Sequence, residues 1–269
     1  MRWDCTNEEY HADRTCISRS TLELVRESPK LYPLWRDGKW KRKETQEFRM
    51  GTAFHCMILE PSDFANKYWT TDYPDKRGKD YKKSVIEHPD HVVLSRPEWT
   101  QLNEMRRQLN KAPEAHDLFV GGQNEQSWKF THSVIGFDCK IRPDCLKSDI
   151  HTCVELKTSK NPETFLKSVQ AYGYHRQEAF YWFGLGQNDI ELKAFKFVVV
   201  GTEIPEPKVC IYELDEVALK IGLEQIQTMI CDFRDRKNAN NWREKNWNKT
   251  IPLSLESWYI KQHEEGISP

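Results

Sequence analysis

Residues 136–157, GFDCKIRPDCLKSDIHTCVELK, constrain the fold more than any other stretch of this chain. Apolar and polar side chains alternate in both halves, which is the period of β-strands. In the second half this alternation puts Glu155 and Lys157 on the same face. A polar turn separates the halves, so we predict a β-hairpin with arms 136–145 and 150–158.

The predicted hairpin brings acidic groups and an ammonium group together. Asp144 follows Pro143, which ends regular strand pairing because it has no N–H to donate. Two carboxylates, from Asp144 and Glu155, can hold one or two Mg²⁺ ions through oxygen ligands. A metal-bound water becomes a nucleophile near neutral pH, and Lys157 can orient it. The pattern therefore indicates metal-dependent phosphodiester hydrolysis, although a cross-strand salt bridge on a solvated face would look the same.

The composition is that of a globular protein. Of 269 residues, 30% are charged and 38% hydrophobic, and the net charge is −1. This balance excludes a globally basic nucleic-acid-binding protein, but local basic runs at 36–43, 76–79 and 234–237 can still line a groove. The sequence contains no run of about 18 apolar residues, so it predicts no membrane-spanning helix. The N-terminus lacks the apolar core of a secretory signal. We expect a cytoplasmic location and no membrane partner.

The eight cysteines form no CxxC pair, and the C-terminal third holds only two of them. Zinc and iron–sulfur sites need tighter spacing. We therefore predict reduced, structural thiols and no iron–sulfur cluster. The cysteines are at positions 5, 16, 56, 139, 145, 153, 210 and 231.

Hydrophobic periodicity along the rest of the chain predicts one domain, 1–269, in which helices surround a small sheet. We expect residues 1–16 to be poorly ordered at the start, 72–95 to be a surface loop, and 238–269 to be an extension that packs on the core. The expected helices are 18–28 (capped by Ser18 or Ser20, with Glu23 in a capping box), 47–60, 98–110, 161–171, 175–185 and 215–234. The expected further strands are 125–130, which would complete a three-stranded meander with the hairpin, 194–200 and 209–214.

Four more polar side chains occur in a definite order around the hairpin. His55 ends the sequence GTAFH inside the predicted helix 47–60. Glu125 begins a predicted strand, and Gln177 and Tyr181 share one face of a later helix. Taken one at a time, a helical histidine is more often a packed residue, and a carboxylate at a strand end is more often an exposed one. Their order carries more information than any single residue.

The order GxxxH, a lone Glu, a D…(D/E)xK core and QxxxY resembles the RecB-like branch of PD-(D/E)xK nucleases, and most closely its phage-type, RecE (exonuclease VIII)-like exonucleases. The resemblance begins near Tyr10, includes the ISRSTL start of the first helix, and ends near Trp258. It implies an α/β fold of the α+β type, with a restriction-endonuclease-like core in which helices flank a mixed central sheet.

The resemblance also implies roles for individual residues. Asp144 and Glu155 would be metal ligands, with the Leu156 carbonyl oxygen and His55 completing the shell, and Lys157 would position the attacking water. Glu125 would support a second metal or its waters. Side chains that would contact DNA phosphate or brace the site are Gln177 and Tyr181. Weaker candidates for binding DNA, including its 5′ end, are Ser18, Ser20, Arg26, Lys39, Trp40, Lys41 and Arg42.

By the same resemblance, the expected reaction is Mg²⁺-dependent 5′→3′ digestion of one strand of linear double-stranded DNA, with two ions per site and Mn²⁺ as a possible substitute. A 3′ overhang would remain for a single-strand annealing protein of the RecT or Redβ kind. A ring-shaped homo-oligomer of three or four chains is expected. Glu155 stands where RecE-like sequences often have Asp, which could shift the metal geometry. An endonuclease or repair nuclease with the same core, and a catalytically idle DNA-binding module, remain alternatives.

Overall fold

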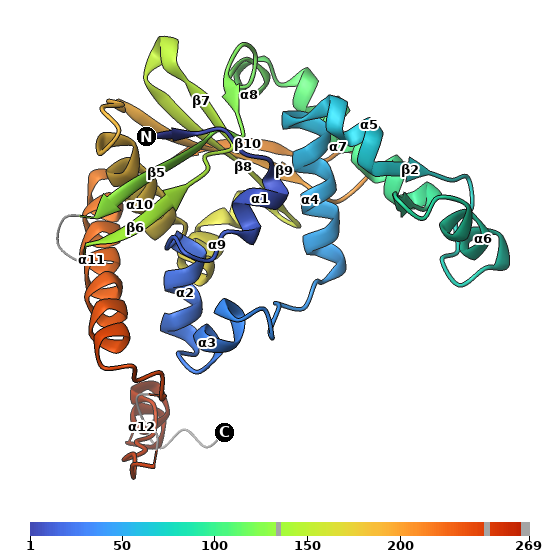
Figure 1. Ribbon diagram of the computed structural model, residues 1–269. Coiled ribbons are helices and arrows are strands. Elements are labelled where there is room, and N and C mark those ends of the chain that lie inside the picture. Colours follow the sequence, from blue (N-terminus) through green and yellow to red (C-terminus); the bar gives the residue numbers. More distant parts are fainter. Residues whose placement is uncertain (133–135, 245–247, 265–269) are drawn as a thin grey trace.

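Figure 1 shows the computed structural model, which describes residues 1–132, 136–244 and 248–264. The strands are β1 Arg2–Trp3, β2 Tyr68–Thr70, β3 Val92–Leu94, β4 Gln123–Asn124, β5 Ser127–His132, β6 Phe137–Ile141, β7 Cys145–Lys147, β8 Thr152–Ser159, β9 Ala194–Gly201 and β10 Val209–Glu213. The α-helices are α1 Asn7–Ala12, α2 Arg19–Glu27, α3 Leu31–Arg36, α4 Gln46–Leu59, α5 Pro61–Lys67, α6 Lys79–Glu87, α7 Arg96–Lys111, α8 Pro113–Asp117, α9 Phe165–Tyr172, α10 Tyr174–Gly186, α11 Glu216–Asn238 and α12 Ser257–Glu264. Short 3₁₀ turns are η1 Ser148–Ile150 and η2 Pro162–Thr164.

A mixed sheet with helices on both faces forms the centre of the molecule, as predicted. Its strand order is β10-β9-β8-β7-β4, and only the β8–β9 pair is parallel. One hydrophobic cluster joins α2, α9, α10 and α11 to one face, through Phe195 and Phe197 of β9. A second cluster joins α4, α7 and α8 to the other face, through Val198 and Val200 of the same strand. Burial on both faces explains the continuous apolar run of β9.

The predicted hairpin 136–158 is divided between two sheets. Its turn is η1, and β7 pairs with β8 in the central sheet. The first half of the first arm, β6, instead pairs with β5 in a separate sheet of order β1-β5-β6. The expected three-stranded meander is therefore wrong. Pro143 lies in the three-residue connection between β6 and β7, and because it lacks an N–H it cannot continue either ladder.

The N-terminal residues are part of the fold, contrary to the expectation of poor order at 1–16. Strand β1 pairs with β5, and Tyr10 of α1 is buried. Helix α2 begins after Ser18, whose side chain caps it together with Thr21. Of the two predicted caps, Ser18 is therefore confirmed and Ser20 is wrong. The predicted capping box with Glu23 is also wrong, because Glu23 is a buried ion-pair partner.

Residues 72–95 contain a helix and a strand where a surface loop was expected. Strand β3 pairs in parallel with β2, and Figure 1 shows α6 at the far end of an arm that leaves the body beyond α4. Tyr81 of α6 is buried and donates a hydrogen bond to the Val93 carbonyl at 2.7 Å. Only one more residue of α6 is buried, Ser84, so this helix is mostly exposed.

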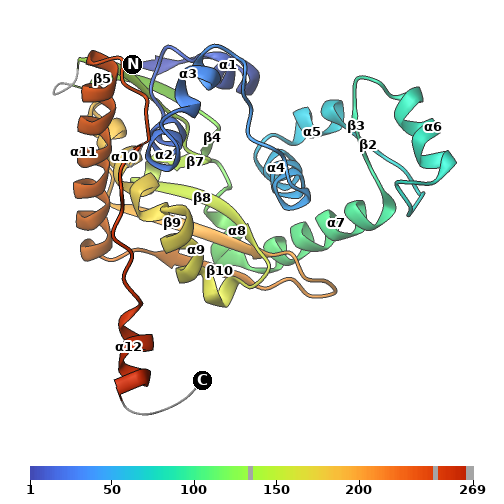
Figure 2. The same cartoon turned by 90° about the horizontal axis from the view of Figure 1, so that it is seen from below.

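Within the described parts of the C-terminal extension, 238–244 and 248–264, packing on the core is seen at its beginning. Trp242 lies against Tyr32 and Phe233, with ring centroids 4.2 and 5.6 Å apart. Helix α12 has no buried residue, and Figures 1 and 2 both show it away from the body, so the predicted packing is wrong there. Trp247, another residue of the predicted extension, lies outside the described residues. Helix α11 continues to Asn238, four residues beyond its predicted end.

All eight cysteines are free thiols, and five of them are buried. Across the described ranges, no helix is both long enough and apolar enough to cross a bilayer.

Candidate active site

Asp144, Glu155 and Lys157 come together where β7 and β8 pair. The Leu156 N–H donates to Asp144 Oδ2 at 2.7 Å, and the Asp144 N–H donates to Glu155 Oε1 at 3.2 Å. Lys157 Nζ lies 2.6 Å from Glu155 Oε2 and 3.9 Å from Asp144 Oδ2. The backbone next to Glu155 thus holds the Asp144 carboxylate, and the backbone of Asp144 holds the Glu155 carboxylate. The ammonium group of Lys157 lies near both.

The alternation of β8 explains why these groups share a face. Val154 and Leu156 are fully buried in the cluster with α4 and α7, as predicted. Glu155 therefore projects to the opposite face, toward α10, where only 1% of its surface is exposed. A carboxylate so deeply buried requires partners, and Lys157 is one of them.

His55 reaches the same place from α4. Its Nε2 lies 2.6 Å from the Leu156 carbonyl oxygen and 3.3 Å from Asp144 Oδ2, and its Nδ1 lies 2.9 Å from the Gly51 carbonyl oxygen. Gly51 also lets the helix come close to β8, because a Cβ there would stand 3.3 Å from Thr158 Oγ1. The predicted grouping of His55 with Asp144 and the Leu156 carbonyl is present in the geometry.

Gln177 and Tyr181, one turn apart on α10, contact different parts of the site. Gln177 Nε2 donates to Glu155 Oε2 at 2.6 Å. The Tyr181 hydroxyl donates to the Arg142 carbonyl oxygen at 3.3 Å, on the connection that precedes Asp144. Gln177 thus orients a carboxylate directly, and Tyr181 braces the backbone beside it.

Glu125 lies next to Asp144, in a turn before β5 and not in the strand where it was predicted. Its backbone is left-handed, with φ of 51°, and its N–H donates to the Asp144 carbonyl oxygen at 3.0 Å. Its carboxylate accepts a hydrogen bond from Arg142 Nε at 2.7 Å. Arg142 was not among the predicted site residues, although its position just before Pro143-Asp144 is a signal that could have identified it.

The electrostatics of the site reflect this crowding of acids. Burial and the neighbouring Asp144 carboxylate raise the pKa of Glu155 and of Glu125 to about 7. Burial alone would also raise the pKa of Asp144, but the cations Lys157 and His55 lower it. Burial would lower the pKa of His55, yet Asp144 raises it to about 9. The negative charge of the carboxylates is thus offset by Lys157 and His55 and by the raised pKa values of Glu155 and Glu125.

The donors present fit a divalent cation. Asp144 Oδ2 and the Leu156 carbonyl oxygen both lie within 3.3 Å of His55 Nε2, so three donor groups converge on one point, with Glu155 beside it. Carboxylate and carbonyl oxygens suit Mg²⁺ and Mn²⁺. Among the described residues, no three His, Cys, Asp or Glu side chains form a ready-made metal group, and the donors that converge here include one backbone oxygen, that of Leu156.

The DNA-binding candidates of the basic run lie in the connection between α3 and α4. Arg42 forms an ion pair with Glu27 of α2 at 3.1 Å, which ties this connection to the body. The Trp40 N–H donates to the Leu34 carbonyl oxygen. Two of the lysines of the run, the candidates Lys39 and Lys41, are exposed.

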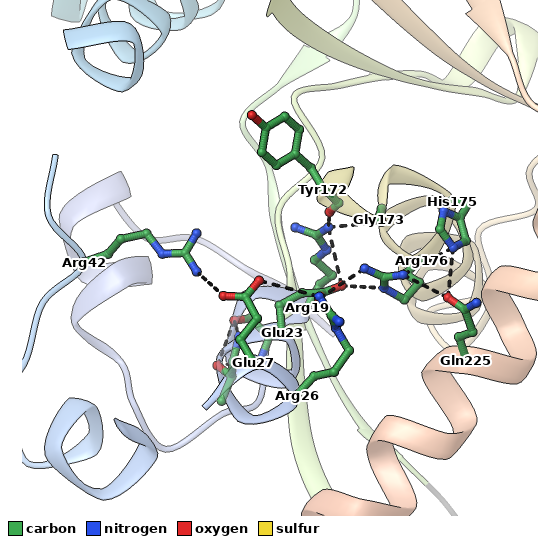
Figure 3. A network of polar contacts seen from close by, with 12 residues as sticks. Arg19, Glu23, Arg26, Glu27, Arg42, Tyr172, Gly173, His175, Arg176 and Gln225 are labelled. Carbon is green, nitrogen blue, oxygen red and sulfur yellow. Dashed lines mark hydrogen bonds and ion pairs between the residues drawn. The ribbon is translucent and has the colours of Figure 1, made fainter. Parts of the chain in front are cut away.

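The other three candidates belong to α2, where a cluster of arginines surrounds Glu23 (Figure 3). Nitrogens of three arginines lie 3.6, 2.7 and 2.6 Å from its carboxylate: Arg19, Arg26 and Arg176. Burial would raise the pKa of Glu23, but Arg176 and Arg19 lower it. Ser20 Oγ is 2.8 Å from Ser18 Oγ, the cap of the same helix.

This arginine cluster fastens α2 to the corner between α9 and α10. Arg19 donates to the carbonyl oxygens of Tyr172 and Gly173, as Figure 3 shows. Arg176 is the residue before Gln177, so the cluster lies one residue from the carboxylate site. Three guanidinium groups share Glu23, and Arg26 also pairs with Glu27 at 3.6 Å. Arg26 and Arg176 also line a cavity of about 520 Å³ between α2, α10 and α11.

Comparisons with known proteins point to one fold family. The family profile described as "PDDEXK-like domain of unknown function (DUF3799)" matches residues 18–246. A candidate exonuclease from Eubacterium rectale superposes with a TM-score of 0.65 at 14% identity, over 96% of this chain and 98% of that one, which shows a shared fold. LHK-Exo of Laribacter hongkongensis, solved in complex with dAMP, gives 0.43 at 14% identity over 97% and 100% of the chains. No curated protein matches the sequence.

Proposed function

Because the chain belongs to the PDDEXK-like family whose profile covers residues 18–246, we propose that it is a divalent-metal-dependent 5′→3′ exonuclease that digests one strand of linear double-stranded DNA. PD-(D/E)xK nucleases generally use divalent ions. The observation that carries the proposal is the convergence of Asp144, Glu155, Lys157 and the Leu156 carbonyl oxygen beside His55.

In the proposed reaction each residue has one task. Mg²⁺, for which Mn²⁺ can substitute, would be held by Asp144, Glu155, the Leu156 carbonyl oxygen and His55, and would activate water and neutralise charge on the scissile phosphate. Lys157, paired with Glu155, orients the attacking water and offsets the phosphate charge. Gln177 keeps the Glu155 carboxylate turned toward this point.

The DNA strand would be guided by the positive groups around the carboxylates. The arginine cluster at the start of α10 is the proposed place for a phosphate of the 5′ end, because Arg176 adjoins Gln177 in sequence and three guanidinium groups gather there. The exposed lysines of the α3–α4 connection would contact the backbone of the duplex. Both proposals rest on charge and position.

The proposal extends to the assembly and its partners. A ring-shaped homo-oligomer of three or four chains would keep the enzyme on its substrate, and the 3′ overhang would be passed to a RecT- or Redβ-like annealing protein for recombination or repair in the cytoplasm. The alternatives are an endonuclease with the same core and an idle DNA-binding module. The complete acid and lysine set argues against the second alternative.

A digestion assay with Mg²⁺ on matched linear and covalently closed DNA tests the activity. One strand of the linear DNA carries a 5′ label, with or without a 5′ phosphate. Early release of labelled mononucleotide, with the circle intact, is the expected result. Cutting of the circle would favour the endonuclease. No cleavage with Mg²⁺ or Mn²⁺ would contradict the nuclease proposal.

Two isosteric variants assign the activity to the site. Glu155→Gln and Lys157→Met keep the side-chain volumes, and each should lower the digestion rate by at least about 100-fold. Lys220→Met, on the exposed face of α11, is the control and should digest at the wild-type rate. Wild-type rates in either site variant would remove these residues from the proposed chemistry.

A further inference from the structure

The connection between β6 and β7 holds a buried cation that none of the roles above explains. Arg142 is 8% exposed and comes two residues before Asp144. Its carbonyl oxygen accepts the hydrogen bond from Tyr181. A buried guanidinium group is costly unless its donors are paired, so its partners indicate what it holds in place.

Its partners come from several parts of the chain that meet only here. Arg142 Nε is 2.7 Å from Glu125 Oε2, and Nη2 is 3.7 Å from Glu60 Oε1 at the end of α4. Its Nη1 donates to Ser127 Oγ at 2.8 Å and to the Cys5 carbonyl oxygen at 3.3 Å. The planar guanidinium fork is thereby fixed in orientation, which a single ammonium group could not reproduce.

Glu125 is held from both of its ends. Its N–H is bonded to the Asp144 carbonyl oxygen, and its carboxylate is bonded to Arg142. The left-handed backbone at Glu125 is a conformation that a side chain with a Cβ adopts at some cost. These two hydrogen bonds and the strained turn fix the Glu125 side chain next to Asp144.

We propose that Arg142 is a positioning residue that presents Glu125 to the divalent-cation site, with Glu60 as the second carboxylate of the same guanidinium group. This inference rests on the proposed function and adds to it the residue that sets the place of the third acid. Arg142 touches neither the cation nor the phosphate. It acts through Glu125, so its loss lowers cation affinity in the way that loss of Glu125 does.

Isothermal titration calorimetry of the whole metal-free chain with Mn²⁺ tests this proposal without any DNA cleavage. Arg142→Lys keeps the charge and loses the fork, and should weaken Mn²⁺ binding about tenfold, the scale on which groups that orient metal ligands act. Glu125→Gln should weaken it to a similar extent. The double variant Arg142→Lys/Glu125→Gln should show no further loss, because both changes remove one interaction.

Controls separate positioning from simple destabilisation. Arg107→Lys changes an arginine in a surface pair with Glu104 and should leave Mn²⁺ binding unchanged. If Arg142→Lys unfolds, Arg142→Met combined with Glu125→Gln removes both charges and should fold, with the affinity of Glu125→Gln alone. Additive losses in the double variant, unchanged Mn²⁺ binding in Arg142→Lys, or no Mn²⁺ binding by the wild type would each overturn the proposal. Absence of DNA cleavage with this binding pattern intact would instead refute the proposed function.

Discussion

The amide group of Gln177 donates a 2.6 Å hydrogen bond to the same Glu155 oxygen that Lys157 holds at 2.6 Å. One carboxylate oxygen thus has two donors from different elements, α10 and β8. The other oxygen accepts the N–H of Asp144. Glu155 therefore has little freedom to rotate, and its orientation depends on all three donors.

Removal of the Gln177 donor should therefore impair cleavage without loss of the fold. Gln177→Leu keeps the volume and leaves Glu155 to Lys157 and the backbone, so we expect digestion to slow about 10- to 100-fold. Steady-state digestion of labelled linear DNA measures the effect. Gln227→Leu, an exposed position of α11, is the control. Equal rates for the two variants would contradict this role for Gln177.

His55 gives the metal-free protein a pH-dependent contribution to stability. Its folded pKa of about 9 is above the value of about 6.5 for an unfolded histidine. The contribution is therefore fully present below pH 6.5 and is lost as the pH rises through 9. We expect His55→Gln to lower the free energy of unfolding by about 2 kcal/mol at pH 6 and by much less at pH 9.5. Urea unfolding in EDTA tests this, with His116→Gln as control, and a difference independent of pH would be the contrary result.

Glu178 on α10 should also make the protein less stable as the pH rises, but here removal of the charge should stabilise the fold. It is 2% exposed, and its Oε2 has no hydrogen-bond partner among the described residues. Burial and the Glu213 carboxylate raise its pKa to about 8. Between pH 4.5 and 8 the folded state keeps a proton that the unfolded state releases, so stability falls as the pH rises. Glu178→Gln should thus gain about 1–3 kcal/mol over the wild type at pH 8.5 and almost nothing at pH 4.5. A gain of equal size at both pH values would contradict the assignment.

Gly173, between α9 and α10, should tolerate no side chain. Its φ is +66°, and a Cβ would lie 2.0 Å from Arg176 Nη2. Gly121 has a similar φ of +68° with open space around it, so Gly121→Ala isolates the backbone cost of about 1–2 kcal/mol. Gly173→Ala should cost at least about 2 kcal/mol more, because it also displaces Arg176 from Glu23. Thermal unfolding of both variants measures the difference. Equal losses would show that Arg176 can move without cost.

Glu155 and Lys157 could be placed on one face because their signal is local, whereas His55, Glu125 and Gln177 were singled out by the order of motifs that resembles a known family. Period-two alternation around Glu155 and Lys157 needs no knowledge of distant partners. The sheet arrangement was not predictable in the same way. The chain changes sheets at Pro143 because β6 pairs with β5 and β7 pairs with β8. These pairings depend on contacts between separate segments, which local periodicity does not reveal.

The buried cations were not predicted, for a related reason. Arg142 and Arg176 look like solvated residues in the sequence, and each is buried only because an acid far along the chain, Glu125 or Glu23, lies opposite it. Helix α6 was missed because it belongs to a segment rich in proline, lysine and aspartate, and only two of its residues are buried.

The short passage from Ile141 to Cys145 joins two sheets that otherwise pair separately. Asp144 belongs to that passage, and its backbone is bonded to Glu125 on the side of one sheet and to the Glu155 side chain on the side of the other. The distance between the Asp144 and Glu155 carboxylates therefore depends on how the two sheets are aligned. A substitution that shifts one sheet relative to the other would change this distance, even if the substituted residue is remote from both carboxylates.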